Sequence, residues 1–346
     1  MDRAGPTPRR SYPPEDETDV KKIRGRQEAG SSETLFDLGV PDEREHKAPE
    51  GKPQEATTLT RDTEFQRIAA GETGILAGTS AFTAAGWEGT FYPAGMKAAE
   101  YLRFYATRFR TVEVDSTFYG TPKPERVRAW YERTPRDFVF AVKVPQVITH
   151  EKVLVGCDAE MDEFLQTMGL LGEKLGPLLL QFGYFGPGAM NRGAQFLLRL
   201  EAFLKRLTAV VGPPGRARRL VVEIRNKSWL EESLLALLRE HQVALALTDH
   251  RWMPRPWEVA KKLDLITTDF AYVRWLGDRK GIEEITTRWD KTVVDRRSDL
   301  LHWVEMFREL RRRNLQVYAY ANNHYAGNGP GTVKLFWELY DSGKSG

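Results

Sequence analysis

From residue 75 onward, short runs of apolar, mostly β-branched residues alternate with longer stretches in which apolar residues recur every three or four positions. The short runs predict eight strands, at 75–79, 111–114, 138–144, 178–182, 220–224, 243–247, 271–275 and 316–320. The longer stretches predict helices at 97–109, 125–132, 159–171, 194–207, 231–241, 298–313 and 332–340, with a short helix at 259–263 in the sixth connection. Strands that alternate with helices pair in parallel through right-handed crossovers.

This repetition predicts an α/β fold, a TIM-type (β/α)8 barrel, over residues 74–346. Eight strand–helix units in about 270 residues match the usual size of such a barrel. An open, doubly wound sheet is the alternative, and it usually has fewer strands and a Gly-rich phosphate turn after the first. The turn at that place reads Gly78-Thr79-Ser80-Ala81-Phe82, which has no GxGxxG pattern.

Residues 1–61 differ in composition from the rest of the chain. They mix Pro, Gly, Ser and both signs of charge with few aliphatic residues, and such a segment cannot bury enough apolar surface to offset the entropy of ordering. We therefore expect a disordered N-terminal tail, in which 35–40 form a single apolar island. The Pro- and Gly-rich stretch 212–216 is too short for a domain linker and predicts a loop.

Composition narrows the class of protein. The 51 basic and 48 acidic residues nearly balance at a net charge of +3, which argues against a general nucleic-acid binder. Cys157 is the single cysteine, so an intramolecular disulfide and a cysteine-based metal site are excluded. No apolar run reaches the ~18 residues of a membrane span, and the N-terminus lacks the apolar core of a secretory signal. We expect a cytoplasmic protein without a membrane partner, and the composition favours no particular oligomeric state.

Polar residues stand where the predicted strands end. In a barrel of this kind, side chains at the carboxyl ends of the strands and in the loops that follow form the mouth, which is where ligands bind. The residues in these places are Glu113, Asp115, Ser116, Lys143, Gln181, Glu223, Arg225, Asp249, Arg274, Asn322 and Asn323.

The two-residue period of a strand indicates which of these side chains face the lumen. Val222 and Ile224 face the helices, so Glu223 and Arg225 share the lumen side. The same logic sends three more charges inward, Glu113, Lys143 and Arg274. Charges inside a barrel are costly unless they are paired, so we expect one network of these five residues. Such a network can simply fill the lumen, but five charges together with Gln181 and Asn322 at one end favour a ligand site.

The chain also resembles a known family, the YecE-like proteins (domain of unknown function 72). The matching motifs follow one another in the family's order: GTS at 78–80, WEGTFYP at 87–93, VEVDSTFY at 112–119, FVFAVK at 138–143, LGPLLLQF at 175–182, VEIRNKSW at 222–229 and ANNHYAG at 321–327. This resemblance, from about residue 74 to the C-terminus, implies a TIM-type barrel and no established reaction.

Three places depart from the family pattern. Ala81-Phe82 stands where the family usually has a Trp, and Asn226-Lys227 where it usually has His-Pro. The segment 274–277 lacks the usual histidine of the turn after strand seven. No histidine role is carried over at the last two places.

The residues favour acid/base chemistry without a metal or cofactor. Neighbouring cations can push the pKa values of Glu113 and Glu223 apart, which would give an acid and a base. We therefore assign catalytic roles to Glu113, Lys143 and Glu223, with His150 as a proton shuttle or, equally, a loop residue that caps a turn. The inward Lys and Arg favour a small polar or anionic ligand, sugar- or phosphate-like. Substrate-binding roles are assigned to Asp115, Ser116, Gln181, Arg225, Asp249, Arg274, Asn322 and Asn323.

Three alternatives stay open. Lys143 could form a Schiff base, although a glutamate partner would keep it charged. A metal-dependent hydrolase or isomerase could use Glu113, Glu223, Asp249, His150 and His324, which lack the short spacing of metal motifs. A barrel that binds nucleic acid or a protein partner without catalysis is the third, less favoured, alternative. Its candidate residues are Trp252, Trp257 and Trp275 with Arg251, Arg255 and Lys261.

Overall fold

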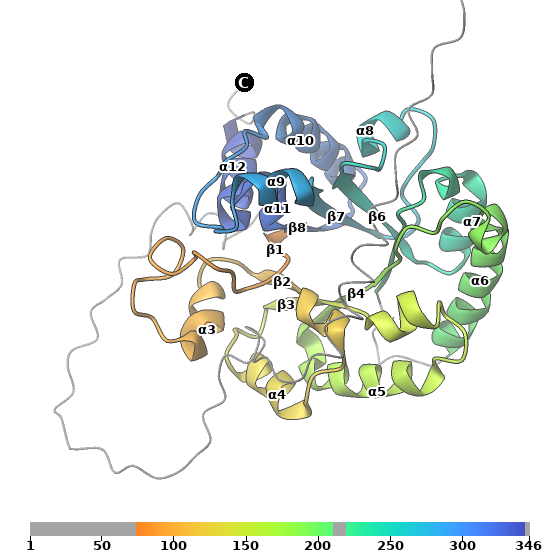
Figure 1. Cartoon of the computed structure of the whole chain (residues 1–346), viewed down its shortest axis with the longest axis horizontal. Coiled ribbons are helices and arrows are strands. Elements are labelled where there is room, and N and C mark those ends of the chain that lie inside the picture. Colours follow the sequence, from red (N-terminus) through yellow and green to blue (C-terminus); the bar gives the residue numbers. More distant parts are fainter. Residues whose placement is uncertain (1–73, 210–218, 343–346) are drawn as a thin grey trace, which may run out of the picture.

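The computed structural model describes residues 74–209 and 219–342 of the 346-residue chain. The predicted tail at 1–61, its apolar island at 35–40 and the loop at 212–216 lie outside the described residues. Within them, strands alternate with helices from the first strand to the last helix, as the hydrophobic pattern predicts (Figure 1).

The strands form one parallel eight-stranded sheet that curves into a barrel. Its order is β1-β8-β7-β6-β5-β4-β3-β2. The strands are β1 (Ile75–Thr79), β2 (Thr111–Val114), β3 (Val139–Lys143), β4 (Leu175–Gln181), β5 (Leu220–Glu223), β6 (Ala244–His250), β7 (Phe270–Gly277) and β8 (Gln316–Ala321). The prediction of a TIM-type barrel is confirmed.

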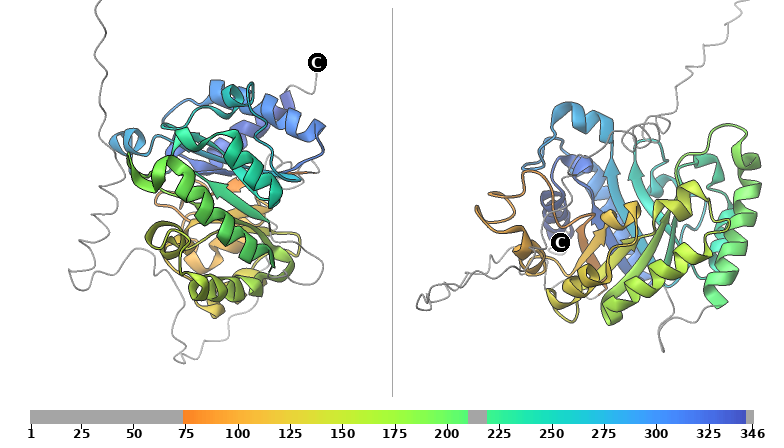
Figure 2. Two further views of the ribbon diagram at one scale, coloured as in Figure 1. Left: turned by 90° about the vertical axis from the view of Figure 1, so that its right-hand side faces the viewer. Right: turned by 60° about the horizontal axis from the view of Figure 1, so that its bottom comes forward.

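Helices surround the strands (Figure 2). They are α3 (Tyr101–Tyr105), α4 (Pro124–Glu132), α5 (Asp158–Met168), α6 (Ala194–Ala209), α7 (Glu232–Glu240), α8 (Pro256–Val259), α9 (Arg279–Ile285), α10 (Arg297–Arg312), α11 (Asn323–Ala326) and α12 (Gly329–Ser342). The short helix of the sixth connection begins earlier than predicted because Pro256 occupies its first turn, a position that suits a residue without an N–H. The pattern missed α9 and α11, which are too short to show a helical period.

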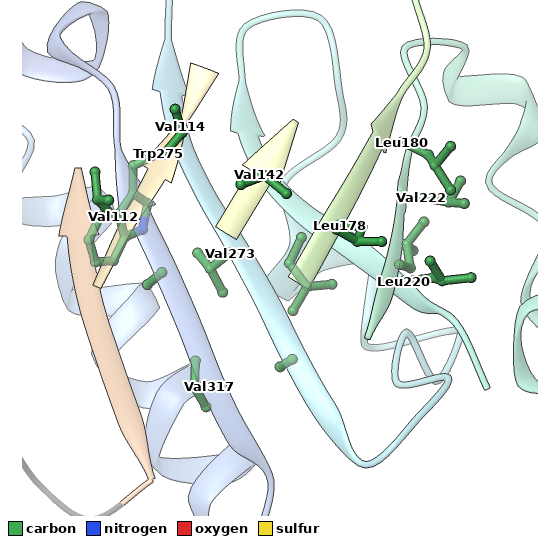
Figure 3. Packing of buried hydrophobic residues seen from close by; sticks show 14 of the residues in the cluster. Val112, Val114, Val142, Leu178, Leu180, Leu220, Val222, Val273, Trp275 and Val317 are labelled. Carbon is green, nitrogen blue, oxygen red and sulfur yellow. The ribbon is translucent and has the colours of Figure 1, made fainter. Parts of the chain in front are cut away.

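Two apolar layers explain why these strands fold into a barrel. Outward side chains such as Val112, Val142, Val222 and Val273 pack beneath the helices (Figure 3). Inward side chains form a second cluster that fills the lumen. Its buried members are Ala141, Leu179, Val221, Ala244, Ala246, Phe270, Tyr272, Tyr318 and Tyr320. The lumen is therefore a packed core up to the layer at the carboxyl ends of the strands.

Between β1 and β2 the barrel is not closed by strand pairing. Across the described residues these two strands make no ladder, although they lie side by side. The hydroxyl of Tyr105 on α3 fills the gap: it accepts a hydrogen bond from the Thr79 N–H (2.9 Å) and donates one to the Thr111 carbonyl (3.2 Å). A side-chain hydroxyl therefore takes the place of strand pairing at this seam.

No helix in the described ranges combines the length and the apolar character needed to span a membrane.

Candidate active site at the barrel mouth

A chain of buried charges crosses the lumen at the carboxyl ends of the strands. Arg274, on β7, stands between Glu113 on β2 and Glu223 on β5. Its Nη2 and Nε atoms lie 2.6 and 3.1 Å from Glu113 Oε1, and its Nη1 lies 2.8 Å from Glu223 Oε2. The two glutamates are fully buried and Arg274 is 3% exposed, so one guanidinium is shared by two carboxylates that have no access to water.

Glu113 has a second donor. The Tyr272 hydroxyl, from the same strand as Arg274, donates to Glu113 Oε2 at 2.5 Å. Burial raises the pKa of Glu113; Arg274 opposes the shift and Asp115 adds to it. Burial disfavours the charge of Arg274 as well, but Glu113 and Glu223 raise its pKa well above the usual value, so the guanidinium stays charged.

Glu223 has the opposite tendency. Burial raises the pKa of its carboxyl, but Arg225 and Arg274 together outweigh burial and bring the pKa down to about 2. Nη1 of Arg225 lies 2.7 Å from Glu223 Oε1 in an ion pair whose geometry is not that of a hydrogen bond. The surroundings therefore shift the pKa values of the two buried glutamates in opposite directions.

Lys143 and Asp115 lie nearer to solvent. Lys143 Nζ is 3.7 Å from Asp115 Oδ1, and the same oxygen is 3.5 Å from Arg274 Nη2. The side chain of Lys143 is 11% exposed, and that of Asp115 is 34% exposed. Lys143 Nζ also lies over the Phe118 ring, 3.9 Å from its centre. Burial lowers the pKa of Lys143, an effect that Asp115 counteracts.

Two half-buried histidines adjoin this network. His150 follows β3, and its ring meets the Phe118 ring edge-to-face at 5.0 Å. Burial, with Lys143 and Arg225, lowers its pKa to about 4. His250 ends β6, and burial, with Arg225, lowers its pKa to about 3. Both rings are therefore neutral at physiological pH.

The comparisons with known proteins place the chain in a family. The family model described as "Protein of unknown function DUF72" matches residues 76–345. The chain belongs to this family.

Curated relatives of this DUF72 chain carry only family-level names. The UPF0759 protein YecE of Escherichia coli K12 is 42% identical over 87 residues, 25% of this chain and 32% of YecE, so the match spans about a third of that relative. The UPF0759 protein YunF of Bacillus subtilis strain 168 is 25% identical over 282 residues, 75% of this chain and 94% of YunF.

Solved DUF72 structures share the fold. The protein from Thermotoga maritima has a TM-score of 0.58 at 25% identity and covers 79% of this chain and 99% of its own. One from Enterococcus faecalis has a TM-score of 0.57 at 21% identity, covering 77% and 95%.

Some residues assigned to the site in this DUF72 chain lie elsewhere. Asp249 faces the outer helices, where its Oδ2 accepts hydrogen bonds from Trp303 Nε1 and the Tyr325 hydroxyl, both at 2.9 Å, and its Oδ1 pairs with Arg255. Ser116 is exposed beside Asp115. The binding roles of both residues remain predictions, but neither joins the charged network.

The remaining amides occupy the rim of the mouth. Gln181 is the register partner of Glu223, and its Nε2 donates to the Phe182 carbonyl at 2.7 Å. Asn322 Nδ2 donates to Ser80 Oγ at 3.0 Å. Asn323 Oδ1 accepts from the Gly329 N–H at 2.8 Å, a bond within the loop that begins α12.

Tyr272, His250 and Phe118 touch or adjoin the network and were not assigned to it from the sequence. The two-residue period of the strands could have identified Tyr272 and His250. Tyr272 lies two residues before Arg274, and His250 lies two residues after the lumen-facing Thr248, the register partner of Arg274. Phe118 follows a strand end in a one-turn helix, where a two-residue period gives no direction.

Some residues of the nucleic-acid and metal alternatives are held by other contacts. Trp275 is fully buried against Phe307 and Phe336, so it has no ring face to offer a nucleic acid. Trp257 stacks on His302 at 4.9 Å. Within the described ranges, no three His, Cys, Asp or Glu side chains come together as ligands for a metal ion.

Proposed function

We propose that this protein is an acid/base enzyme that acts on a small polar or anionic metabolite at the mouth of its barrel. The observation that carries the proposal is the depth order of the charges. Arg274 and the two glutamates are buried, while Lys143 and Arg225 lie above them with side chains 11% and 16% exposed. A ligand at the mouth therefore reaches Lys143 and Arg225, together with the more exposed Asp115, before it reaches the two glutamates.

The placement of the charges supports an anionic group on the ligand. Three cations face three carboxylates, and two of the cations, Lys143 and Arg225, lie nearer the opening than Glu113 and Glu223. Guanidinium and ammonium groups bind carboxylate and phosphate oxygens strongly where water is scarce. Arg225 and Lys143 are thus the anion-binding pair of the proposed site.

The same residues supply the acid and the base. Glu113, whose pKa is raised, holds a proton more readily than Glu223, whose pKa is about 2. Two carboxyls whose pKa values are separated in this way by their surroundings are a typical basis for proton transfer in enzymes. Lys143, with its lowered pKa, and Asp115, the more exposed of the pair, would exchange protons with the ligand at the opening.

The first experiment measures anion binding by titration calorimetry with inorganic phosphate at low salt. We expect saturable binding to the wild-type protein, and a loss of about tenfold or more in affinity in Arg225→Gln. Arg288→Gln is the control, because Arg288 is exposed and lies in another loop. Equal binding to all three proteins would overturn the anion-binding assignment.

The second experiment tests proton transfer. Sugar phosphates of three to six carbons are incubated with the enzyme in D2O, and loss of carbon-bound protons is followed by 1H NMR. We expect exchange with the wild-type protein on at least one compound and at least a hundredfold less with Glu113→Gln. Absence of exchange on every compound would overturn the acid/base activity while leaving the binding result intact.

A further inference from the structure

Two imidazoles stand on either side of the Glu223–Arg225 pair, one after β3 and the other at the end of β6. His150 lies beside Gly183, two residues after β4, and His250 ends β6; β4 and β6 are the two neighbours of β5, the strand that ends at Glu223. Both side chains are half-buried, so each can reach a ligand at the mouth. The hydrogen bonds at Nδ1 of each ring decide what its Nε2 atom can do.

In His250 the backbone fixes the proton. The Trp252 N–H donates to Nδ1 at 3.3 Å, so Nδ1 is an acceptor and the neutral ring carries its hydrogen on Nε2. Ala244 and Ala246 of the same strand belong to the lumen cluster, and alternation places His250 on the same side. Asp249, one residue earlier, points outward to α10 and α11, as alternation along a strand requires. His250 therefore presents an uncharged N–H donor.

In His150 the arrangement is reversed. The Thr149 hydroxyl donates to the Pro145 carbonyl at 3.5 Å, and Thr149 Oγ1 lies 2.8 Å from His150 Nδ1. With its own proton directed at Pro145, Oγ1 accepts from Nδ1–H, which leaves Nε2 as an acceptor. Gly183 keeps this edge of the ring clear, because a Cβ there would lie 3.3 Å from Nε2.

We propose that His150 and His250 bind the same ligand as an uncharged pair. His150 Nε2 accepts a hydrogen bond from a ligand hydroxyl, and His250 Nε2–H donates one to a neighbouring carbonyl or hydroxyl oxygen. This inference rests on the proposed function and narrows its substrate class to an α-hydroxycarbonyl or polyol that also carries an anionic group for Arg225 and Lys143. The low pKa values of both rings, which follow from burial and the nearby cations, keep the pair neutral.

The tautomers are tested without any ligand. The whole protein is labelled with 15N in its six histidines, and His150→Gln and His250→Gln assign the two imidazoles. Between pH 5.5 and 8 we expect the 15N shifts of a protonated Nε2 and bare Nδ1 in His250, and of a bare Nε2 and protonated Nδ1 in His150. The same tautomer in both rings, or an imidazolium in either at pH 6, would overturn the inference.

Ligand contact is tested with dihydroxyacetone phosphate, ribose 5-phosphate and fructose 6-phosphate, with inorganic phosphate as the reference. We expect at least one sugar phosphate to bind about tenfold more tightly than phosphate and to shift both Nε2 resonances. His250→Gln, whose amide can still donate at the Nε2 position, should retain that advantage, and His250→Asn should lose it.

The outcomes separate the two proposals. Two results would refute the proposal that His150 and His250 bind one ligand while leaving the proposed function intact. In the first, phosphate binds to the wild-type protein but no sugar phosphate binds more tightly. In the second, His250→Asn binds sugar phosphates as tightly as the wild type does. If neither phosphate nor any sugar phosphate binds, the proposed function fails and this inference fails with it.

Discussion

Arg274 holds Glu113 by two of its nitrogens on a single carboxylate oxygen, Nη2 at 2.6 Å and Nε at 3.1 Å. The third nitrogen, Nη1, donates to Glu223 on β5. The Arg274 side chain thus links β7 to both β2 and β5 at the level of the mouth. Because all three charged groups are buried, removal of any one of them leaves a buried charge without its partner.

The first prediction concerns the loss of this central cation. Arg274→Met leaves two buried carboxylates without their shared partner, and we expect the free energy of unfolding to fall by about 3–5 kcal/mol. Urea denaturation followed by circular dichroism measures it. Arg313→Met is the control, since Arg313 pairs with Asp264 where the side chains are 41% and 52% exposed, and its loss should cost less than about 1 kcal/mol. Equal costs for the two variants would contradict the buried network.

The second prediction is a pH dependence of stability. His150 and His250 have folded-state pKa values of about 4 and about 3, below the usual 6.5, so the unfolded chain takes up protons first as pH falls. Stability from these neutral rings is fully present above pH 6.5 and is lost as pH falls toward the folded values. Glu223, with its pKa of about 2, adds a further loss below pH 4.5.

Urea denaturation midpoints from pH 7.5 to 4.5 measure this slope. In the double variant His150→Gln, His250→Gln we expect a flatter profile between pH 6.5 and 4.5. His302→Gln is the control, because His302 lies on α10, away from the charged network, and its variant should keep the wild-type slope. A double variant with an unchanged slope would show that these imidazoles titrate normally.

Strand periodicity explains how much of the site could be predicted. Period two places Glu113, Lys143, Glu223 and Arg274 inward, and the structure brings these four together with Arg225. The same parity, applied to β6, separates the buried outward residues Leu245 and Leu247 from the lumen residues Ala244 and Ala246. It puts Asp249 outward, toward Trp303 and Tyr325, and His250 inward.

Other features depend on contacts that no local pattern encodes. Phe118 beneath Lys143 lies in a one-turn helix whose direction is set by packing. The seam between β1 and β2 requires Tyr105, from a different element, to reach both strands. From the sequence, a tyrosine on a helix is expected to be an ordinary core residue. Only the position of the Tyr105 hydroxyl in the structure shows that its hydrogen bonds replace a strand ladder.

The third prediction concerns the close approach at this seam. A Cβ built on Gly78 would lie 2.2 Å from the Thr111 carbonyl oxygen, a backbone atom that cannot swing away. Gly78→Ala should therefore force β1 from β2 and lower stability by about 1–3 kcal/mol or more. Gly169→Ala is the matched control, because nothing lies within 4 Å of its Cβ position and its φ of −56° suits alanine. If both variants melt alike, the strands are not in contact at Gly78.

The fourth prediction removes the bridging hydroxyl itself. Tyr105→Phe keeps the buried ring but leaves the Thr79 N–H and the Thr111 carbonyl without their shared partner, which should cost about 1–3 kcal/mol. Hydrogen exchange measured by NMR should show the Thr79 amide exchanging at least tenfold faster, because the hydroxyl that accepts its hydrogen bond is lost. The Val317 amide, which donates to the Gly74 carbonyl on the other side of β1, should keep its protection relative to global stability. Tyr101→Phe, whose hydroxyl lies outside the seam, serves as the control. Unchanged protection at Thr79 in Tyr105→Phe would mean that β1 and β2 are held together by packing alone.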